Sequence, residues 1–245
     1  MSVLLEVCCG DIASVGAARS AGAARIELCS ALTEGGLTPT PAMTRMAVDA
    51  GGPAVNVLIR PRSGDFLYSA DEVAQMEAEI TDAVAAGTDG IVVGALTADG
   101  DVDIDVMRRF MAVADGRPVT FHRAFDLCRD PRKALDDLIA LGCRRVLTSG
   151  QAASALEGAA LIRRLVEDAD GKIIILAGGG VTAENCRDIV RLTGVEELHA
   201  SAKHTVGSAM RFRRADVSMG IPDTDEYSRA TTDASRVAAI IKALE

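Results

Sequence analysis

Short apolar runs rich in β-branched residues alternate with segments of helical periodicity along the whole chain. The runs carry few polar positions, which is typical of parallel strands covered by helices. The pattern predicts eight strands, at Leu4–Cys9, Arg25–Ser30, Val55–Pro61, Gly90–Leu96, Pro118–Phe125, Arg145–Gly150, Lys172–Gly178 and Glu197–Ala202.

Helical segments fill the gaps between these strands, and several carry start or stop signals. Asp, Ser or Thr stands at most of the predicted N-caps, proline follows it in two cases, and glycine ends several segments. The helices are predicted to start at Asp11, Thr40, Ser69, Asp103, Asp130, Ala153, Thr182 and Asp233.

Strict alternation of strands and helices leaves few topologies, and the parallel (β/α)₈ barrel, or TIM barrel, is the simplest. A doubly wound open sheet is the alternative, but residues 9–16 lack the G-x-G-x-x-G fingerprint of a dinucleotide site. The chain has 245 residues, and a barrel has about 250. We therefore expect one α/β domain over residues 1–245, with an irregular segment at 203–231 and a C-terminal helix at 233–244 packing on the barrel.

Composition and charge narrow the class of partner. A net charge of -9 argues against a nucleic-acid or anionic-membrane surface, and 3% aromatic residues argue against base stacking. No stretch approaches the roughly 20 apolar residues of a membrane span, and the N-terminus does not have the pattern of a signal peptide. The six cysteines form no C-x-x-C pair. We expect a cytoplasmic protein with reduced thiols, and we find no signature for nicotinamide, flavin or ATP.

Polar side chains gather at the ends of the predicted strands, where barrel enzymes carry their active sites. The fifth strand leads from Val119 and Phe121 directly into His122, Arg123 and Asp126. Other strands end similarly, with Glu6 and Cys8, Glu27 and Cys29, Arg60 and Arg62, Thr148 and Ser149, Gly178 to Gly180, and His199 and Ser201.

Two glutamates on neighbouring strands raise an electrostatic question. If Glu6 and Glu27 faced inward, their carboxylates would repel each other unless cations compensated them. Arg60, His122 and His199 are the available cations. In an enzyme, His122 would be the acid or base, with Glu6 or Glu27 as its partner and His199 nearby. A buried ion-pair network that only stabilises the barrel explains the same residues.

A glycine run after the seventh predicted strand favours anion binding. Its backbone N–H groups and the following helix would face the place where barrels often bind phosphate, although a tight turn explains the same glycines. A phosphorylated or carboxylate metabolite would suit this place. The candidate anion-binding residues are Arg60, Arg62, Arg123, Ser149, Gly178, Gly179, Gly180 and Ser201.

A pair of cysteines favours a soft metal. Cys8 and Cys29 stand at matching places on strands that should be neighbours, about 4.8 Å apart. Two facing thiolates suit Cu(I). Cys9 has the opposite parity and should point into the helix layer. The alternative is that Cys8 and Cys29 simply pack, as buried cysteines usually do.

Nine segments match those of a known family, in order and over essentially the whole chain. They are Leu5–Cys9, Arg25–Cys29, Glu34–Pro39, Ile59–Phe66, Val119–Asp126, Arg145–Gln151, Gly178–Val181, Glu197–Ala202 and Asp225–Arg229. On these segments the chain resembles the CutC proteins, the copper homeostasis family.

The resemblance implies a TIM barrel, a cytoplasmic location, a homodimer or larger homo-oligomer, and a role in copper homeostasis with Cu(I) as the bound metal. The family's proposed Cu(I) thiols fall on Cys8 and Cys29. The alternative hypothesis is a TIM-barrel enzyme that acts on a small anionic metabolite, because copper binding does not explain why Arg60, His122 and Arg123 should converge at one mouth. A metal ion or a small anion is the expected partner in either case.

Overall fold

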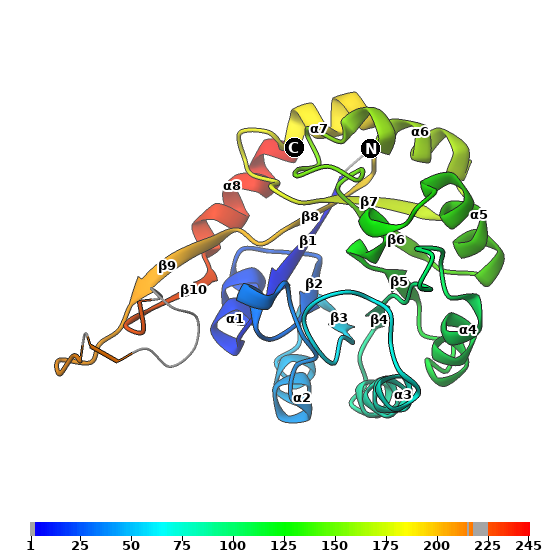
Figure 1. The fold of residues 1–245 in the computed structure, drawn as a ribbon. Coiled ribbons are helices and arrows are strands. Elements are labelled where there is room, and N and C mark those ends of the chain that lie inside the picture. Colours follow the sequence, from blue (N-terminus) through cyan, green and yellow to red (C-terminus); the bar gives the residue numbers. More distant parts are fainter. Residues whose placement is uncertain (1–2, 215, 218–224) are drawn as a thin grey trace.

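The computed structural model of the protein describes residues 3–214, 216–217 and 225–245. Eight parallel strands pair in sequence order and β8 pairs with β1, so the sheet closes into a barrel (Figure 1). The predicted (β/α)₈ class is therefore confirmed. The barrel strands are β1 (Leu4–Cys9), β2 (Arg25–Leu28), β3 (Ala54–Leu58), β4 (Gly90–Val93), β5 (Val119–Phe121), β6 (Arg145–Thr148), β7 (Ile174–Gly178) and β8 (Glu197–Ala200).

A ring of helices covers the outside of the barrel (Figure 1). The last helix closes the ring, because it contacts both the first and the seventh. Within the described residues, no helix is both long and apolar enough to cross a membrane. The helices are α1 (Ile12–Ser20), α2 (Pro41–Asp49), α3 (Ala70–Ala85), α4 (Ile104–Val113), α5 (Pro131–Leu141), α6 (Ala159–Ala169), α7 (Cys186–Thr193) and α8 (Ala234–Leu244).

Capping side chains fix the starts of several helices where the sequence predicts them. The Asp11 carboxylate accepts a hydrogen bond from the Ser14 backbone N–H at 2.6 Å. Ser69 and Glu72 form a complete capping box at the start of α3. Because each cap satisfies backbone N–H groups that the helix itself leaves unpaired, the local sequence is sufficient to set these boundaries.

The predicted end of the fifth strand was wrong. The strand ends at Phe121 instead of Phe125, and residues Arg123–Leu127 form a 3₁₀ helix. His122 causes the change, because its Nδ1 atom accepts a hydrogen bond from the Ala124 backbone N–H at 3.2 Å. The chain therefore turns away from the sheet at the first residue of the polar stretch.

Two helices begin later than predicted. Helix α6 starts at Ala159, because the Ala155 N–H donates to the Gly179 carbonyl at 2.9 Å and holds the preceding loop against the end of β7. Helix α7 starts at Cys186, because the Thr182 N–H donates to the Asn185 side chain at 2.8 Å in a turn. Helical periodicity in the sequence does not predict either contact.

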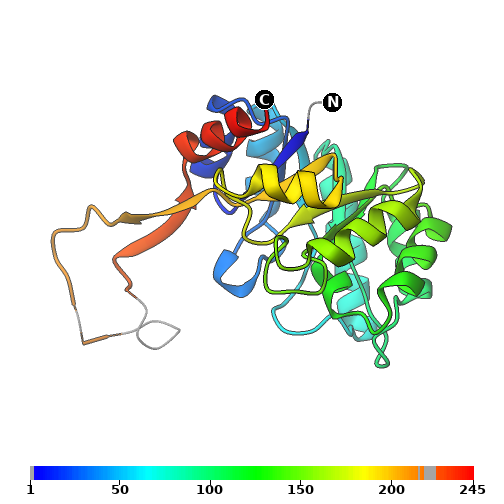
Figure 2. The same cartoon turned by 90° about the horizontal axis from the view of Figure 1, so that it is seen from above.

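The segment predicted as irregular contains a hairpin arm. β9 (Lys203–Gly207) and β10 (Ser228–Thr232) pair antiparallel and project from the barrel (Figures 1 and 2). Thr232 anchors the base of the arm, since its Oγ1 donates to the Cys8 carbonyl at 3.2 Å. Residues 215 and 218–224 of this segment lie outside the described residues. The helix predicted for 233–244 follows as α8, capped by Asp233.

The hydrophobic core lies between the sheet and the helices, whereas the barrel interior is mixed. The large buried side chains of the outer layer include Ile26, Phe110 and Leu138. The interior contains a separate small cluster of Cys8, Cys29, Leu58 and Val92. Barrel interiors are usually filled by layers of branched apolar side chains, so the polar part of this interior needs its own explanation.

A buried charge cluster fills one part of that interior. Arg25 donates to Glu6 at 2.5 Å and also to Glu197, and Arg145 donates to Glu197 at 2.8 Å. The Glu6 and Arg25 side chains are almost fully shielded from solvent. Charges buried in this way are tolerated only when each is paired and hydrogen-bonded.

Arg25→Met should therefore destabilise the fold strongly. The substitution leaves the Glu6 and Glu197 carboxylates short of a cation, and removing one partner from a buried ion pair costs about 3–5 kcal/mol. Arg109→Met is the matched control, because Arg109 pairs with Glu77 on the surface, where such pairs contribute about 1 kcal/mol or less. Urea unfolding measures both, and equal losses in the two variants would contradict this interpretation.

Candidate functional site

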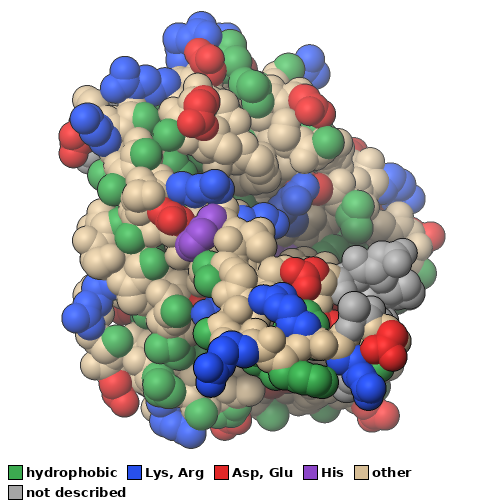
Figure 3. Space-filling view, turned by 90° about the vertical axis from the view of Figure 1, so that its left-hand side faces the viewer, with side chains coloured by type: hydrophobic (Ala, Val, Ile, Leu, Met, Phe, Trp, Pro, Cys, Tyr) green, Lys and Arg blue, Asp and Glu red, His purple; other side chains and the backbone are tan. Residues whose placement is uncertain are grey.

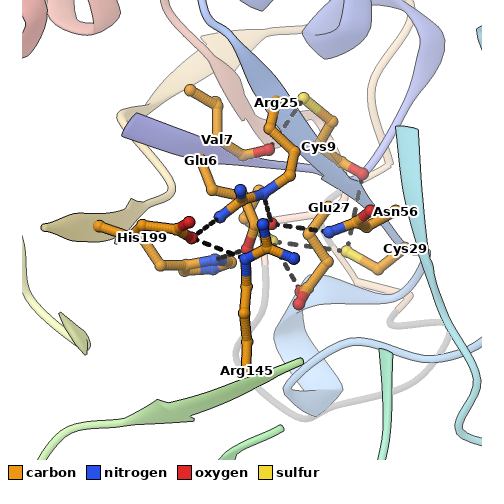
Figure 4. Close-up of polar contacts among 11 residues, drawn as sticks. Glu6, Val7, Cys9, Arg25, Glu27, Cys29, Asn56, Arg145 and His199 are labelled. Atoms are coloured by element: carbon orange, nitrogen blue, oxygen red, sulfur yellow. Dashed lines mark hydrogen bonds and ion pairs between the residues drawn. The ribbon is translucent and has the colours of Figure 1, made fainter. Parts of the chain in front are cut away.

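Glu6 is the most connected residue of the barrel interior. Its carboxylate accepts hydrogen bonds from Arg25 Nε, from Asn56 Nδ2 at 3.1 Å and from His199 Nδ1 at 2.8 Å (Figure 4). Burial alone would raise the pKa of Glu6, but the hydrogen bond and charge of His199, together with Arg25, lower it to about 2. Glu6 is therefore a permanent anion that orients its neighbours.

His199 stands on β8 directly beside Glu6 in the β1–β8 register. Burial would lower the pKa of His199, but the charge of Glu27 and the hydrogen bonds to Cys8 and Glu6 raise it well above its usual value. Because Glu6 holds Nδ1, the Nε2 atom is the ring nitrogen left for Cys8 or for a metal ion bound there. A carboxylate that orients an imidazole in this way is the usual support of a metal-binding histidine.

Cys8 and Cys29 face each other inside the barrel, with their sulfur atoms 3.6 Å apart. Both are free thiols and both are buried. The predicted register was wrong, because Cys8 lies opposite Glu27 and Cys29 follows two residues later. The thiols still meet because Cys29 stays close to β1 beyond the end of β2, where its N–H donates to the Cys9 carbonyl at 3.0 Å. The Cys9 side chain lies in the outer core, as its parity predicts.

Glu27 completes the cluster around the Cys8 thiol. Its Oε1 lies 3.8 Å from the Cys8 sulfur, and its Oε2 has no hydrogen-bond partner within the described residues. Burial raises the pKa of Glu27 to about 7, against the opposing charge of His199. The hydrogen bond to Cys29 and burial likewise raise the pKa of Cys8 well above its usual value.

The cluster offers three types of metal ligand in one place. The ligand atoms of Cys8, Glu27 and His199 all lie within 4.8 Å of one another. With the Cys29 sulfur close by, the site combines two soft sulfur donors, one imidazole and one carboxylate. Thiolate and imidazole donors favour soft or borderline ions such as Cu(I) and Zn²⁺ over hard ions such as Mg²⁺.

A pocket of about 690 Å³ opens beside this cluster. Cys8, His199 and Arg123 form part of its wall, and most of the other lining residues come from the end of β8, the loops after β7 and β8, and α8. Figure 3 shows Lys and Arg side chains beside a recessed area on the face that carries the arm. The pocket lies at the carboxyl ends of the strands, which is the functional face of a TIM barrel.

Part of the predicted anion set lines this pocket, namely Arg123, Gly179, Gly180 and Ser201. Ser149 is not among the lining residues but supports Arg123, since its Oγ accepts a hydrogen bond from the Arg123 guanidinium at 2.8 Å. Gly178 closes β7, where an added Cβ would lie 2.6 Å from the Leu147 side chain. The glycine at 178 is therefore explained by packing.

Arg60 and Arg62 are not among the residues that line the pocket, and their contacts stabilise loops instead. Arg60 donates to the carbonyl oxygens of Glu34 and Gly36, at 2.9 and 3.1 Å, and to a third carbonyl. Arg62 forms an ion pair with Glu72 at 2.5 Å. The prediction that Arg60 compensates the Glu6 and Glu27 carboxylates was wrong, because backbone carbonyls occupy its guanidinium.

His122 is also separate from the cluster. Its ring packs 4.8 Å from the Phe66 ring, and it forms no hydrogen bond or ion pair with Glu6 or Glu27 in the described structure. Burial and the charge of Arg60 lower its pKa to about 3. His122 is therefore a neutral core imidazole at physiological pH and does not compensate either glutamate.

Sequence reasoning missed Arg25, which compensates Glu6, and Glu197, the second carboxylate that pairs with Arg25. Arg25 stands two positions before Glu27, and Glu197 stands two positions before His199, so strand parity alone places each pair on one face. The predicted strand starts contained this signal. Arg236, which lines the pocket, carries no such signal because its place depends on how α8 folds back onto the barrel.

The fold and this site together define a (β/α)₈ barrel protein with a thiol, imidazole and carboxylate cluster at the mouth of the barrel. The sequence profile of the CutC family matches residues 3–204, and the chain belongs to this family. The resemblance seen in the sequence is thus confirmed.

Known relatives agree with this assignment. The chain is 49% identical over 245 residues to a family protein CutC of Chromobacterium violaceum, covering 100% of this chain and 99% of the relative. It is 47% identical over 235 residues to a copper homeostasis protein cutC homolog of Homo sapiens, covering 96% and 86%. The solved structure of a CutC protein from Streptococcus agalactiae matches with a TM-score of 0.78 and 36% identity, covering 81% of this chain and 98% of that one.

The low pKa of His122 predicts an acid-sensitive fold. An unfolded histidine titrates near its ordinary value of 6.5 and folded His122 near 3, so the unfolded chain binds more protons between these pH values and folding weakens as the pH falls. The expected contribution is about 1.4 kcal/mol per pH unit below 6.5, or about 2 kcal/mol at pH 5.

Urea unfolding at pH 7 and pH 5 tests this with His122→Gln. The variant should lose less stability than the wild type on acidification. Parallel pH profiles for the wild type and His122→Gln would show that His122 is not buried in its neutral form.

Proposed function

We propose that this protein binds Cu(I) through Cys8 and Cys29 as part of copper homeostasis. The observation that carries the proposal is the 3.6 Å separation of two buried, free sulfur atoms. Membership of the CutC family supports copper as the metal, and a relative at 47% identity is named a copper homeostasis protein. Two thiolates suit Cu(I), which accepts few ligands.

The surroundings of the thiols fit a metal that is taken up and released. Cys8 lines the pocket, so an ion can reach it from solvent, whereas Cys29 is fully buried behind it. His199 is a candidate third ligand, since Glu6 already orients its ring. Metal binding displaces the protons of the thiols, and the carboxylate nearest to the Cys8 sulfur is that of Glu27.

We also propose, from family membership, that the protein acts in the cytoplasm and as a homo-oligomer. The cysteines of the described chain are all free, which fits a reducing compartment.

An anaerobic Cu(I) titration against a competing chelator tests the thiol pair. The wild type should bind one Cu(I) per chain. Cys8→Ser and Cys29→Ser should each weaken binding by at least about 10–100-fold, because even the loss of an outer-shell partner costs that much at many metal sites.

Cys143→Ser is the matched control, because Cys143 is a buried thiol of the outer core, remote from the pair. It should bind as the wild type does. Equal affinity in Cys8→Ser and the wild type would exclude the pair as the binding site.

A second candidate function is catalysis on a small anionic metabolite. The supporting observation is that the pocket places His199 and Cys8 next to basic side chains at the functional face of the barrel. Glu27, with its pKa near 7, and His199 would then be the acid–base pair, and His122 would have no part. Cys29→Ser separates the two candidate functions, because it removes a proposed copper ligand but no residue that lines the pocket. Copper binding should weaken in this variant, whereas any catalytic activity should remain.

A further inference from the structure

We infer that the pocket between β7, β8 and α8 binds the phosphate group of a small organic phosphate, with Arg123 as its main anchor. The inference deepens the second candidate function and rests on it, and it is independent of copper binding. Four features of the pocket carry it: an arginine held in place, free backbone donors, an excess of positive charge, and an apolar wall.

Arg123 is held in a fixed orientation at the pocket wall. Its Nε pairs with Asp126 at 2.7 Å and its Nη2 donates to Ser149 at 2.8 Å. Its Nη1 has no partner within the described residues, and 47% of the side chain is exposed. The free edge of a guanidinium that is already ordered loses little entropy when it binds an oxyanion.

Asp126 is itself saturated and cannot readily release Arg123. Its carboxylate accepts hydrogen bonds from the Thr148 hydroxyl at 2.5 Å, from the Ser149 N–H at 3.0 Å and from the Gln151 N–H at 3.1 Å. These donors come from the last residue of β6 and the loop after it, so the 3₁₀ helix and this part of the chain together position the arginine. An arginine needed only for a surface ion pair would not require this support.

Backbone N–H groups line the pocket opposite and beside Arg123. Those of Gly179, Gly180, Ser201 and Ala202 make no hydrogen bond within the described part of the chain. Gly179 has a φ of +102°, and an added Cβ would lie 3.8 Å from the Arg123 guanidinium carbon. The positive φ and the 3.2 Å approach of that Cβ to the Ser149 Cβ explain the glycine, and they leave the backbone within van der Waals distance of the arginine.

The charge of the pocket is positive in a protein of net charge -9. Lys203 and Arg236 line the pocket together with Arg123, and Glu184 is the only carboxylate among the lining residues in the described structure. The Arg236 guanidinium donates to the Lys203 carbonyl at 2.5 Å, which fixes its place. Several cations that line one pocket attract a multivalent anion more strongly than a monovalent one.

The remaining wall is apolar and indicates an organic ligand. Val181, Ala200, Ala239 and Ile240 line it. The volume of about 690 Å³ lies within the range of small-molecule sites. A phosphate has three free oxygens and nearly two charges for these donors, whereas a carboxylate has two oxygens and one charge, so the arrangement favours a phosphate ester.

Isothermal titration calorimetry with inorganic phosphate, glycerol 3-phosphate, glycerol and acetate tests the inference. The wild type should bind glycerol 3-phosphate more tightly than phosphate, and should bind glycerol and acetate weakly or not at all. Arg123→Gln should weaken phosphate binding by about 10-fold or more, the effect of one charge-assisted hydrogen-bond pair.

Arg132→Gln is the matched control, because Arg132 is 78% exposed and 3.8 Å from its nearest carboxylate. It should bind as the wild type does. Lys203→Gln, a surface change, should weaken binding several-fold and covers the case in which Arg123→Gln does not fold. The inference would be overturned if the wild type bound neither phosphate compound or bound acetate equally well. It would also be overturned if neither Arg123→Gln nor Lys203→Gln weakened phosphate binding.

The Cys29→Ser variant distinguishes phosphate binding from copper binding. It should retain phosphate binding even though its copper binding is lost. Phosphate binding without turnover of any phosphorylated metabolite would leave the pocket assignment standing and contradict the catalytic function alone.

Discussion

The ionised carboxylate of Glu6 is the constraint on which the rest of the interior depends. It joins β1 to β2 through Arg25, to β3 through Asn56 and to β8 through His199 (Figure 4). These contacts span the seam where the barrel closes. A buried anion must be satisfied by all its neighbours at once, so one side chain links the positions of β2, β3 and β8 to β1.

On these strands, the residues of the site stand at every second position and therefore share one face of the sheet. Arg25, Glu27 and Cys29 follow one another on one face of β2 and its extension, and Glu6 precedes Cys8 in the same way on β1. The ion pairs of Arg25 therefore lie toward the amino ends of these strands, and Cys8 lies level with Glu27 in the β1–β2 register, where it also lines the pocket. Cys8 and His199 belong to the cluster and to the pocket wall, so a metal on Cys8 would form part of the surface that a pocket ligand meets.

The fold was predictable because its signals are local. Alternation of apolar runs with capped helices gave the eight strands and most helix starts, since residues such as Ser69 and Glu72 satisfy their own helix. The end of β5 was not predictable from periodicity, because a single side-chain to backbone hydrogen bond of His122 ends the strand.

The site was predictable only in part. Parity brought Glu6, Cys8, Glu27 and His199 to one face, and these residues do converge. The partners of the glutamates were wrong, because residue type cannot tell whether Arg60 meets carboxylates or the carbonyls of its own loops. Arg236 lies outside any strand-end pattern, and only the return of α8 onto the barrel brings it to the pocket.

X-ray absorption at the copper edge of Cu(I)-loaded protein tests the thiol pair most directly. Two sulfur neighbours and one nitrogen neighbour around copper are expected, with one sulfur lost in Cys29→Ser and the nitrogen lost in His199→Ala. Copper surrounded only by nitrogen and oxygen, or an unchanged spectrum in Cys29→Ser, would contradict a site made by Cys8 and Cys29.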